Sequence, residues 1–183
     1  MNWSIESTRR VIRDRWLSVR ADRCRMPDGR EVDPYYVLEY PDWVNVVAVT
    51  ESEEVVLVRQ YRHGVARVVL ELPSGVVEGS DAGPLETARR ELLEETGYTS
   101  DAFRLTGVLS ANPATHNNLT HCFLASACRK VAEPRLDDIE ELEVVVVPLD
   151  RLGGLAREGA LLQSLHVGSV FFALAELGRL QFR

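Results

Sequence analysis

The chain has 183 residues, of which 45% are hydrophobic and 27% charged, an ordinary balance for one globular domain or for one domain with a small appendage. The formal net charge of −7 argues against general binding of DNA or RNA, which usually needs a basic surface. The N-terminal stretch MNWSIESTRRVIRDRW has no apolar core of signal-peptide length and no apolar run is long enough to cross a bilayer, so we expect a cytoplasmic protein with neither nucleic-acid nor membrane partners.

The N-terminal segment 1–41 is predicted to form a pair of β-strands. Residues 16–26 and 31–40 alternate or are rich in strand-forming residues, and the sequence Pro-Asp-Gly between them is typical of a turn. Such a pair is marginally stable alone and must pack against something. We therefore expect a small antiparallel sheet at 1–41, followed by a main domain at 42–183.

The main domain is predicted to contain many strands, a central helix, and helices at its end. Strands are expected at 43–50, 54–62, 68–75, 103–110, 121–130 and 141–150. The central helix is expected near 84–96, where Pro84 suits the first turn and Gly97 suits the position after the end. Two more helices are expected from RLGGLAREG and LLQSLHVGSVFFALAEL. This order predicts an α+β fold, an α/β/α sandwich around a mixed sheet.

The predicted central helix concentrates negative charge on one face. At about 100° per residue, Glu91, Glu94 and Glu95 lie within one arc of about 100°. Like charges at this spacing repel each other, and a divalent cation would neutralise them. Carboxylate oxygens are hard ligands that suit Mg²⁺ or Mn²⁺. On the helix alone, a solvated acidic face explains the three residues equally well.

The helix is part of a longer motif that opens at Gly75. The stretch RELLEETGY, from Arg90 to Tyr98, closes the motif. The whole resembles the Nudix box, which reads Gly, five residues, Glu, seven residues, then Arg-Glu-apolar-x-Glu-Glu-x-Gly-apolar. Every position of the closing part is filled, whereas Asp81 stands at the first acidic position and the loop before Arg90 is one residue longer than the pattern.

The resemblance implies a hydrolase that cleaves a nucleoside diphosphate linked to another group, using Mg²⁺ or Mn²⁺ and water. It implies that Arg90 orients a glutamate of the box. The metal ligands that it implies are Glu91, Glu94, Glu95 and a backbone carbonyl at Ser74 or Gly75. The general base is then Glu95, or Glu140 or Glu141 in the loop before the last strand; a solvated acidic loop is the alternative for the last two.

The flanks resemble the ADP-ribose pyrophosphatase and nucleotide-sugar branch, through VVLVRQYRHG at 55–64 and the LELPSG that follows. This implies hydrolysis of ADP-ribose to AMP and ribose 5-phosphate by a homodimer. Arg59 and Arg62, three apart at a strand end, are candidates for binding phosphate oxygens; the alternative is a pair of surface arginines on a strand edge. Trp43 is a candidate for stacking on a base, although core packing is the preferred explanation. Asn117 is a candidate for the substrate cleft, although turn chemistry also explains it.

Two other interpretations stay open. One is a Nudix hydrolase for another substrate, such as GDP-mannose, a dinucleotide or coenzyme A. The other is a ligand sensor with a Nudix fold and no turnover, a class that usually loses glutamates of the box. All the helix glutamates are present here. Release of AMP with Mg²⁺ would separate an enzyme from a sensor.

Overall fold

The computed structural model describes residues 2–136 and 141–180. The chain divides into two compact units, and each is built from two segments that are distant in sequence. The first unit comprises residues 1–41 and 110–119, and the second comprises residues 42–109 and 120–183. The second unit contains the acidic helix.

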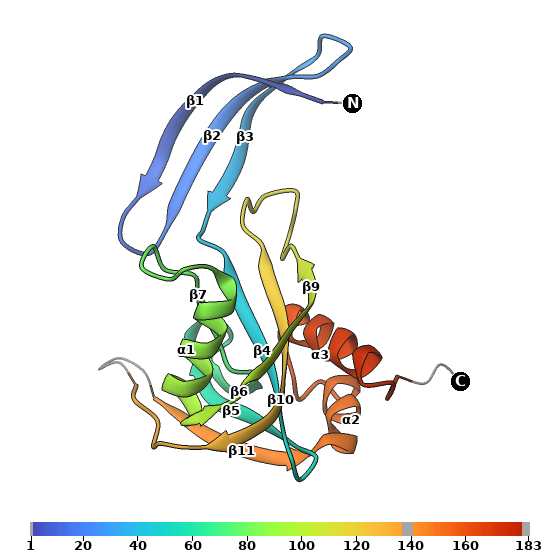
Figure 1. Ribbon diagram of the computed structural model, residues 1–183. Helices are drawn as coiled ribbons and strands as arrows, with labels where there is room; N and C mark the ends of the chain where they lie inside the picture. The colour runs from blue at the N-terminus through green and yellow to red at the C-terminus, as the bar shows by residue number, and fades with distance from the viewer. Residues whose placement is uncertain (1, 137–140, 181–183) are drawn as a thin grey trace. The chain divides into compact units, whose positions relative to one another are not determined.

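The first unit is an antiparallel sheet with the strand order β1-β2-β3 (Figure 1). Its strands are β1 (Ser4–Arg13), β2 (Ser18–Arg25) and β3 (Glu31–Glu39). The sequence predicted β2 and β3 but not β1. In SIESTRRVIR, polar and charged residues interrupt the alternation of apolar ones, so the usual signal of a strand is missing. Every residue of β1 is exposed.

Residues 110–119 belong to this unit because their backbone bonds to the end of β3. The N–H of Leu38 donates to the carbonyl oxygen of Thr115 at 2.7 Å, and the N–H of Asn117 donates to the carbonyl of Leu38 at 3.3 Å. The hydroxyl of Tyr35 donates to the carbonyl of Ala114. The first unit is thus completed by a segment that follows it by about seventy residues in the chain.

The second unit is a mixed sheet between helices, as the sequence predicted. Its strands are β4 (Trp43–Thr50), β5 (Glu54–Arg62), β6 (Arg67–Glu71), β7 (Ser74–Val76), β8 (Tyr98–Thr99), β9 (Ala102–Leu109), β10 (Thr120–Lys130) and β11 (Leu142–Pro148). Among the described residues the main order is β11-β5-β4-β10-β8, while β6, β7 and β9 pair with β5, β4 and β10. β10 runs parallel to β4, and β4 is antiparallel to β5 and β7.

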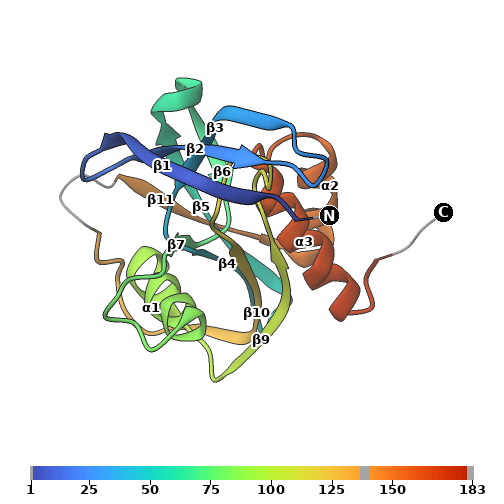
Figure 2. The same ribbon diagram turned by 90° about the horizontal axis from the view of Figure 1, so that it is seen from above.

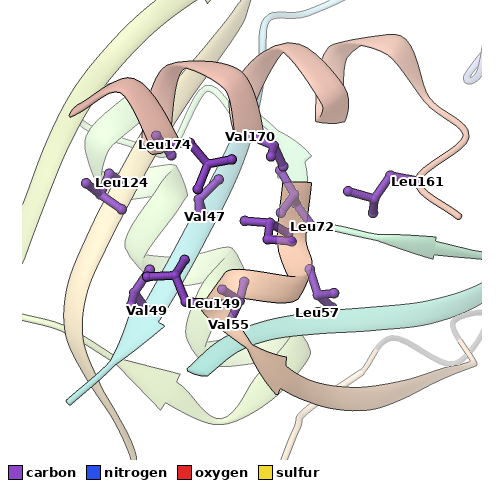
Figure 3. Close-up of a cluster of buried hydrophobic side chains, with 12 residues drawn as sticks. Val47, Val49, Val55, Leu57, Leu72, Leu124, Leu149, Leu161, Val170 and Leu174 are labelled. Atoms are coloured by element: carbon purple, nitrogen blue, oxygen red, sulfur yellow. The ribbon is translucent and has the colours of Figure 1, made fainter. Parts of the chain in front are cut away.

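Helices cover both faces of this sheet (Figures 1 and 2). They are α1 (Pro84–Thr96), α2 (Leu152–Arg157) and α3 (Ser164–Glu176), with short 3₁₀ turns at His63–Val65 and Leu149–Arg151. Successive residues of β4 face opposite sides. Val44 and Val46 pack in the cluster that includes Leu92 of α1, whereas Val47 packs in the cluster that includes Val170 of α3 (Figure 3). Coverage of both faces explains why all the residues of β4 except Asn45 and Thr50 are apolar.

Helix α1 has the bounds that the sequence predicted, because its end signals are local. Pro84 occupies its first turn, and Gly97 ends it in a left-handed conformation with φ of 73°. The N–H of Gly97 donates to the carbonyl of Leu93 at 2.8 Å. A Cβ at Gly97 would lie 2.0 Å from the carbonyl oxygen of Ala132, so the cap requires glycine both for its φ and for its space.

One expected strand, 68–75, is two short strands in the structure. β6 ends at Glu71 and β7 begins at Ser74. Pro73 lies between them and has no N–H to donate to a ladder, which explains the break. The carbonyl of Pro73 accepts the N–H of Val46 at 2.9 Å instead.

None of the helices in the described part of the chain is long and apolar enough to cross a membrane.

Candidate active site

The three glutamates of α1 differ in exposure. Glu95 is buried at 8% exposure, and its carboxylate accepts the backbone N–H of Ser74 at 3.0 Å. The side chain of Glu91 is 14% exposed, and that of Glu94 is 45% exposed. The acidic face of α1 therefore runs from a buried carboxylate held by β7 to a carboxylate that water reaches.

Gly75 on β7 allows the carboxyl group of Glu91 to lie against the strand. A Cβ at Gly75 would be 2.0 Å from Cδ of Glu91, which is far inside any contact distance. β7 is itself fixed by pairing with β4, where Gly75 is opposite Val44 and Ser74 is opposite Asn45. The glycine that opens the motif thus serves a packing need at the acidic face.

Arg90 connects two of the glutamates to the loop before the helix. Its Nη1 donates to Glu94 at 2.9 Å and lies 2.9 Å from Glu91 Oε1. Its Nη2 donates to the carbonyl of Val76 and to Asp81 Oδ2, each at 3.2 Å. Burial opposes the charge of Arg90, but the bond to Asp81 and the two glutamates outweigh burial and raise its pKa further. Arg90 is therefore a permanent cation beside Glu91 and Glu94.

Asp81 stands at the first acidic position of the motif and supports the helix start. Its carboxylate accepts Arg90, the hydroxyl of Thr87 at 2.8 Å and the N–H of Glu78 at 3.1 Å. These hydrogen bonds, the one from Arg90 first, lower the pKa of Asp81 to about 2. An aspartate in place of the glutamate of the pattern still reaches Arg90 from this loop.

Asp81→Asn is expected to destabilise the protein in a pH-dependent way. The folded-state pKa of about 2 is below the ordinary value of 3.8, so the stabilisation is fully present above the ordinary value and is lost as the pH falls through about 2. Urea unfolding should give a lower midpoint for Asp81→Asn at pH 7, and the gap to the unmodified protein should close between about pH 4 and pH 2.

The matched control for this measurement is Asp101→Asn. Asp101 pairs with Arg129, and both side chains are exposed, at 87% and 57%. An exposed pair contributes little to stability, so Asp101→Asn should leave the urea midpoint nearly unchanged. A constant gap between Asp81→Asn and the unmodified protein from pH 7 to pH 2 would contradict the assignment.

The two candidate arginines of β5 do not converge. Their odd spacing puts Arg59 and Arg62 on opposite faces of the strand, because successive residues of a strand point to opposite sides. Arg62 is bound to the buried carboxylate of Glu71, with Nη2 2.7 Å from Oε2. Arg59 donates to the exposed Glu143 at 2.8 Å.

The two arginines line different cavities. Arg62 and Trp43 border a cavity of about 410 Å³, together with Val65, Val69, Glu71, Leu162 and Gln163. Arg59 and Glu141 border a separate cavity of about 330 Å³. The structure thus brings Trp43 to Arg62, and Glu141 to Arg59.

Two other candidates lie elsewhere. Asn117 belongs to the first unit, where its side-chain oxygen accepts the N–H of Tyr40 at 3.1 Å. Glu140 lies outside the described residues. The roles of both in substrate binding or catalysis stay predictions.

Known proteins resemble the chain along almost its whole length. Residues 39–164 match the NUDIX domain, and residues 3–38 match the nucleoside diphosphate sugar hydrolase N-terminal domain.

The chain belongs to the Nudix family.

Relatives of this Nudix hydrolase include two bacterial enzymes. This chain is 31% identical over 135 residues to the ADP-ribose pyrophosphatase of Bacillus subtilis (strain 168), and the match covers 73% of this chain and 72% of the relative. It is 28% identical over 156 residues to the ADP-ribose pyrophosphatase of Mycobacterium tuberculosis, covering 84% and 74%. The crystal structure of an ADP compounds hydrolase superposes with a TM-score of 0.85 at 22% identity over 98% of both chains, which confirms the fold.

The donor chemistry of the Nudix hydrolase suits the divalent ion that its family uses. Carboxylate oxygens of α1 and backbone carbonyls of β7 are hard ligands of the kind that Mg²⁺ and Mn²⁺ prefer. Within residues 2–136 and 141–180, no three His, Cys, Asp or Glu side chains are close enough together to hold a metal ion as they stand. The carboxylates of Glu91 and Glu94 are both paired with Arg90 instead.

Two buried residues of the Nudix hydrolase were not found by sequence reasoning. Glu71 is 4% exposed and receives the Arg62 guanidinium on both oxygens, at 3.1 and 2.9 Å from Nε. A single glutamate within the apolar run VVLELP was the available signal. His166 is 1% exposed on α3 and bonds to Leu72, which is 94 positions away. No local pattern indicates such a partner.

Proposed function

We propose that this Nudix hydrolase cleaves the diphosphate bond of ADP-ribose, or of a closely related nucleoside diphosphate sugar, to give AMP and ribose 5-phosphate. The observation that carries the proposal is the acidic face of α1, where Arg90 contacts both Glu91 and Glu94 and where Glu95 accepts the N–H of Ser74. The substrate class follows from the relatives, two of which are named ADP-ribose pyrophosphatases.

The metal is assigned to oxygen atoms of the same face. Glu91, Glu94 and Glu95 would hold Mg²⁺ or Mn²⁺, with a backbone carbonyl of Ser74 or Gly75. When bound, the ion polarises the diphosphate and acidifies the attacking water. Arg90 orients the carboxylates of Glu91 and Glu94 through contacts of 2.9 Å to each, and Asp81 is paired with Arg90 in turn.

The general base is one of three carboxylates. A base must come within hydrogen-bond reach of the attacking water, directly or through one water molecule. Glu95 lies on the acidic face itself, whereas Glu141 lies beside Arg59, and Glu140 precedes it in the chain. Glutamine at each position in turn separates the three, because loss of the base removes the acidic limb of the pH–rate profile.

On the substrate side, we assign Trp43 and Arg62 to the same part of the substrate because they line one cavity. An aromatic face next to a guanidinium suits a flat or sugar-like group that carries a phosphate oxygen. Arg59 borders another cavity and is assigned to a different part of the substrate. Asn117 stays a candidate from the first unit.

The proposed function is tested with a panel of substrates. ADP-ribose, GDP-mannose, a dinucleotide and coenzyme A are incubated with Mg²⁺ and with Mn²⁺, and the products are separated by chromatography. We expect AMP and ribose 5-phosphate from ADP-ribose, with a kcat/KM at least about tenfold above the others. A higher value for another compound would overturn the substrate. No release from any compound with either metal would indicate a ligand sensor.

A homodimer is proposed through the first unit. β1 is an edge strand whose residues are all exposed, and an open edge of this kind favours pairing with another chain. Exposed apolar side chains on this strand and beside it include Trp3, Ile5, Val11, Ile12 and Trp16. Light scattering after size exclusion should give twice the chain mass; a monomer mass at every concentration would contradict the dimer.

The cytoplasmic location stays a prediction.

A further inference from the structure

His166 is a buried hydrogen-bond acceptor. It is 1% exposed on α3, and its Nδ1 accepts the N–H of Leu72 at 3.2 Å. A ring nitrogen that accepts is unprotonated, so the proton of the neutral ring is on Nε2. Burial, with a smaller contribution from the charge of Arg62, lowers the pKa of His166 to about 3. The ring is thus neutral at any physiological pH and serves as a fixed acceptor.

The partner of His166 begins the short segment that leads to the acidic face. We call residues 71–75 the β6–β7 segment. At its start, Glu71 is bound to Arg62 and Leu72 to His166. In its middle, the carbonyl of Pro73 accepts the N–H of Val46. Successive residues of the segment are therefore fixed by separate elements of the fold.

The far end of the β6–β7 segment contacts the glutamates. The N–H of Ser74 donates to Glu95 Oε2 at 3.0 Å, and Gly75 packs against the carboxyl group of Glu91. A shift of the backbone at Leu72 would move both contacts, because only Pro73 separates Leu72 from Ser74 in the chain. Leu72 is itself wholly buried below α3 (Figure 3), so water cannot replace the lost acceptor.

We propose that His166 is a positioning residue for the acidic face of α1. It acts through the backbone of the β6–β7 segment. This inference rests on the function proposed for that face. His166 reaches neither substrate nor metal in this role. It holds Leu72, and so sets where Ser74 meets Glu95 and where Gly75 meets Glu91. Mutation of a residue that orients a metal ligand commonly weakens metal binding about 10–100-fold.

The test compares two substitutions of His166. His166→Phe keeps the ring and removes the acceptor, whereas His166→Asn places an amide oxygen near the position of Nδ1. Two measurements apply: amide hydrogen exchange at Ser74 by NMR, without metal, and Mn²⁺ affinity without substrate. We expect His166→Phe to speed exchange at Ser74 and to weaken Mn²⁺ binding about 10–100-fold. His166→Asn should restore most of both.

The control is Leu174→Ala, which removes apolar atoms from the same helix roughly two turns away. Leu174 is buried in the α3 core and lies outside the β6–β7 segment. Leu174→Ala should lower the melting temperature but leave exchange at Ser74 and Mn²⁺ affinity unchanged. If His166→Phe behaves in the same way, the inference is overturned.

Two further outcomes can be told apart. If His166→Phe does not fold, His166→Gln is used in its place. The amide of glutamine lies near the position of Nε2, so His166→Gln should not restore slow exchange at Ser74, whereas His166→Asn should; equal exchange at Ser74 in these two variants would overturn the inference. If the unmodified protein binds no Mn²⁺ and hydrolyses none of the panel, the proposed function fails. The exchange measurement then still decides whether His166 positions Ser74.

Discussion

Glu95→Gln is expected to lower kcat for ADP-ribose by about 10³-fold, within the range of about 10²–10⁴ found for loss of an acid–base group. Glutamine has the shape of glutamate, and its amide oxygen can still accept the N–H of Ser74, which is 3.0 Å away. It lacks the negative charge that a divalent cation and an attacking water both require. Steady-state release of AMP at saturating Mg²⁺ measures the effect, and a thermal melt shows that the fold persists.

The matched control for Glu95→Gln is Glu86→Gln. Glu86 is exposed in the first turn of α1 and lies outside the acidic face. The substitution makes the same change of charge on the same helix, so a general electrostatic effect would appear in both variants. We expect Glu86→Gln to stay within about twofold of the unmodified protein, as a surface change should. A Glu95→Gln variant that keeps more than about a tenth of kcat would contradict both roles proposed for this carboxylate.

Gly75→Ala is expected to lower kcat/KM about 10–100-fold while the fold is retained. The added methyl group would lie 2.0 Å from Cδ of Glu91, so that carboxyl group must swing away from β7. The clash involves the far end of a flexible side chain, and Gly75 is not among the glycines with positive φ. The backbone therefore accepts alanine. Calorimetry with Mn²⁺ should show weaker binding, because one proposed ligand is displaced.

Gly79→Ala is the control for Gly75→Ala. Gly79 lies in the loop between β7 and α1, and a Cβ there would meet nothing within 4 Å. Its φ is also outside the left-handed range that favours glycine. Gly79→Ala should therefore match the unmodified protein in Mn²⁺ affinity and in kcat/KM. Equal losses in the two variants would show that neither β7 nor the loop after it tolerates a side chain at these glycines, and would remove the specific role of Gly75.

The parts of this fold that the sequence predicted depend on local signals. Helix α1 was placed correctly because Pro84 and Gly97 mark its ends, and the family followed from the motif on that helix. β1 was missed because SIESTRRVIR has no alternation of polar and apolar residues. Such a strand is specified by its neighbour β2 and not by its own pattern.

The parts of the site that the sequence did not predict depend on which face a side chain occupies and on distant partners. Arg59 and Arg62 are close in the chain but point to opposite faces of β5, into different cavities. His166 meets Leu72 across 94 positions, which no local window reveals. The carboxylate of Glu71 is paired with Arg62 in the hairpin of β5 and β6, and only the structure shows it to be buried.

The two-part construction of the first unit limits how Nudix relatives can be recombined. A chimaera joined at residue 41 would import foreign strands but keep the native loop 110–119. The N–H of Leu38 and the hydroxyl of Tyr35 both donate hydrogen bonds to that loop in the native chain. The N-terminal sheet is thus not a unit that can be transferred by itself. A transplant between enzymes must carry both stretches, and Asn117 with its contact to Tyr40 travels along with them.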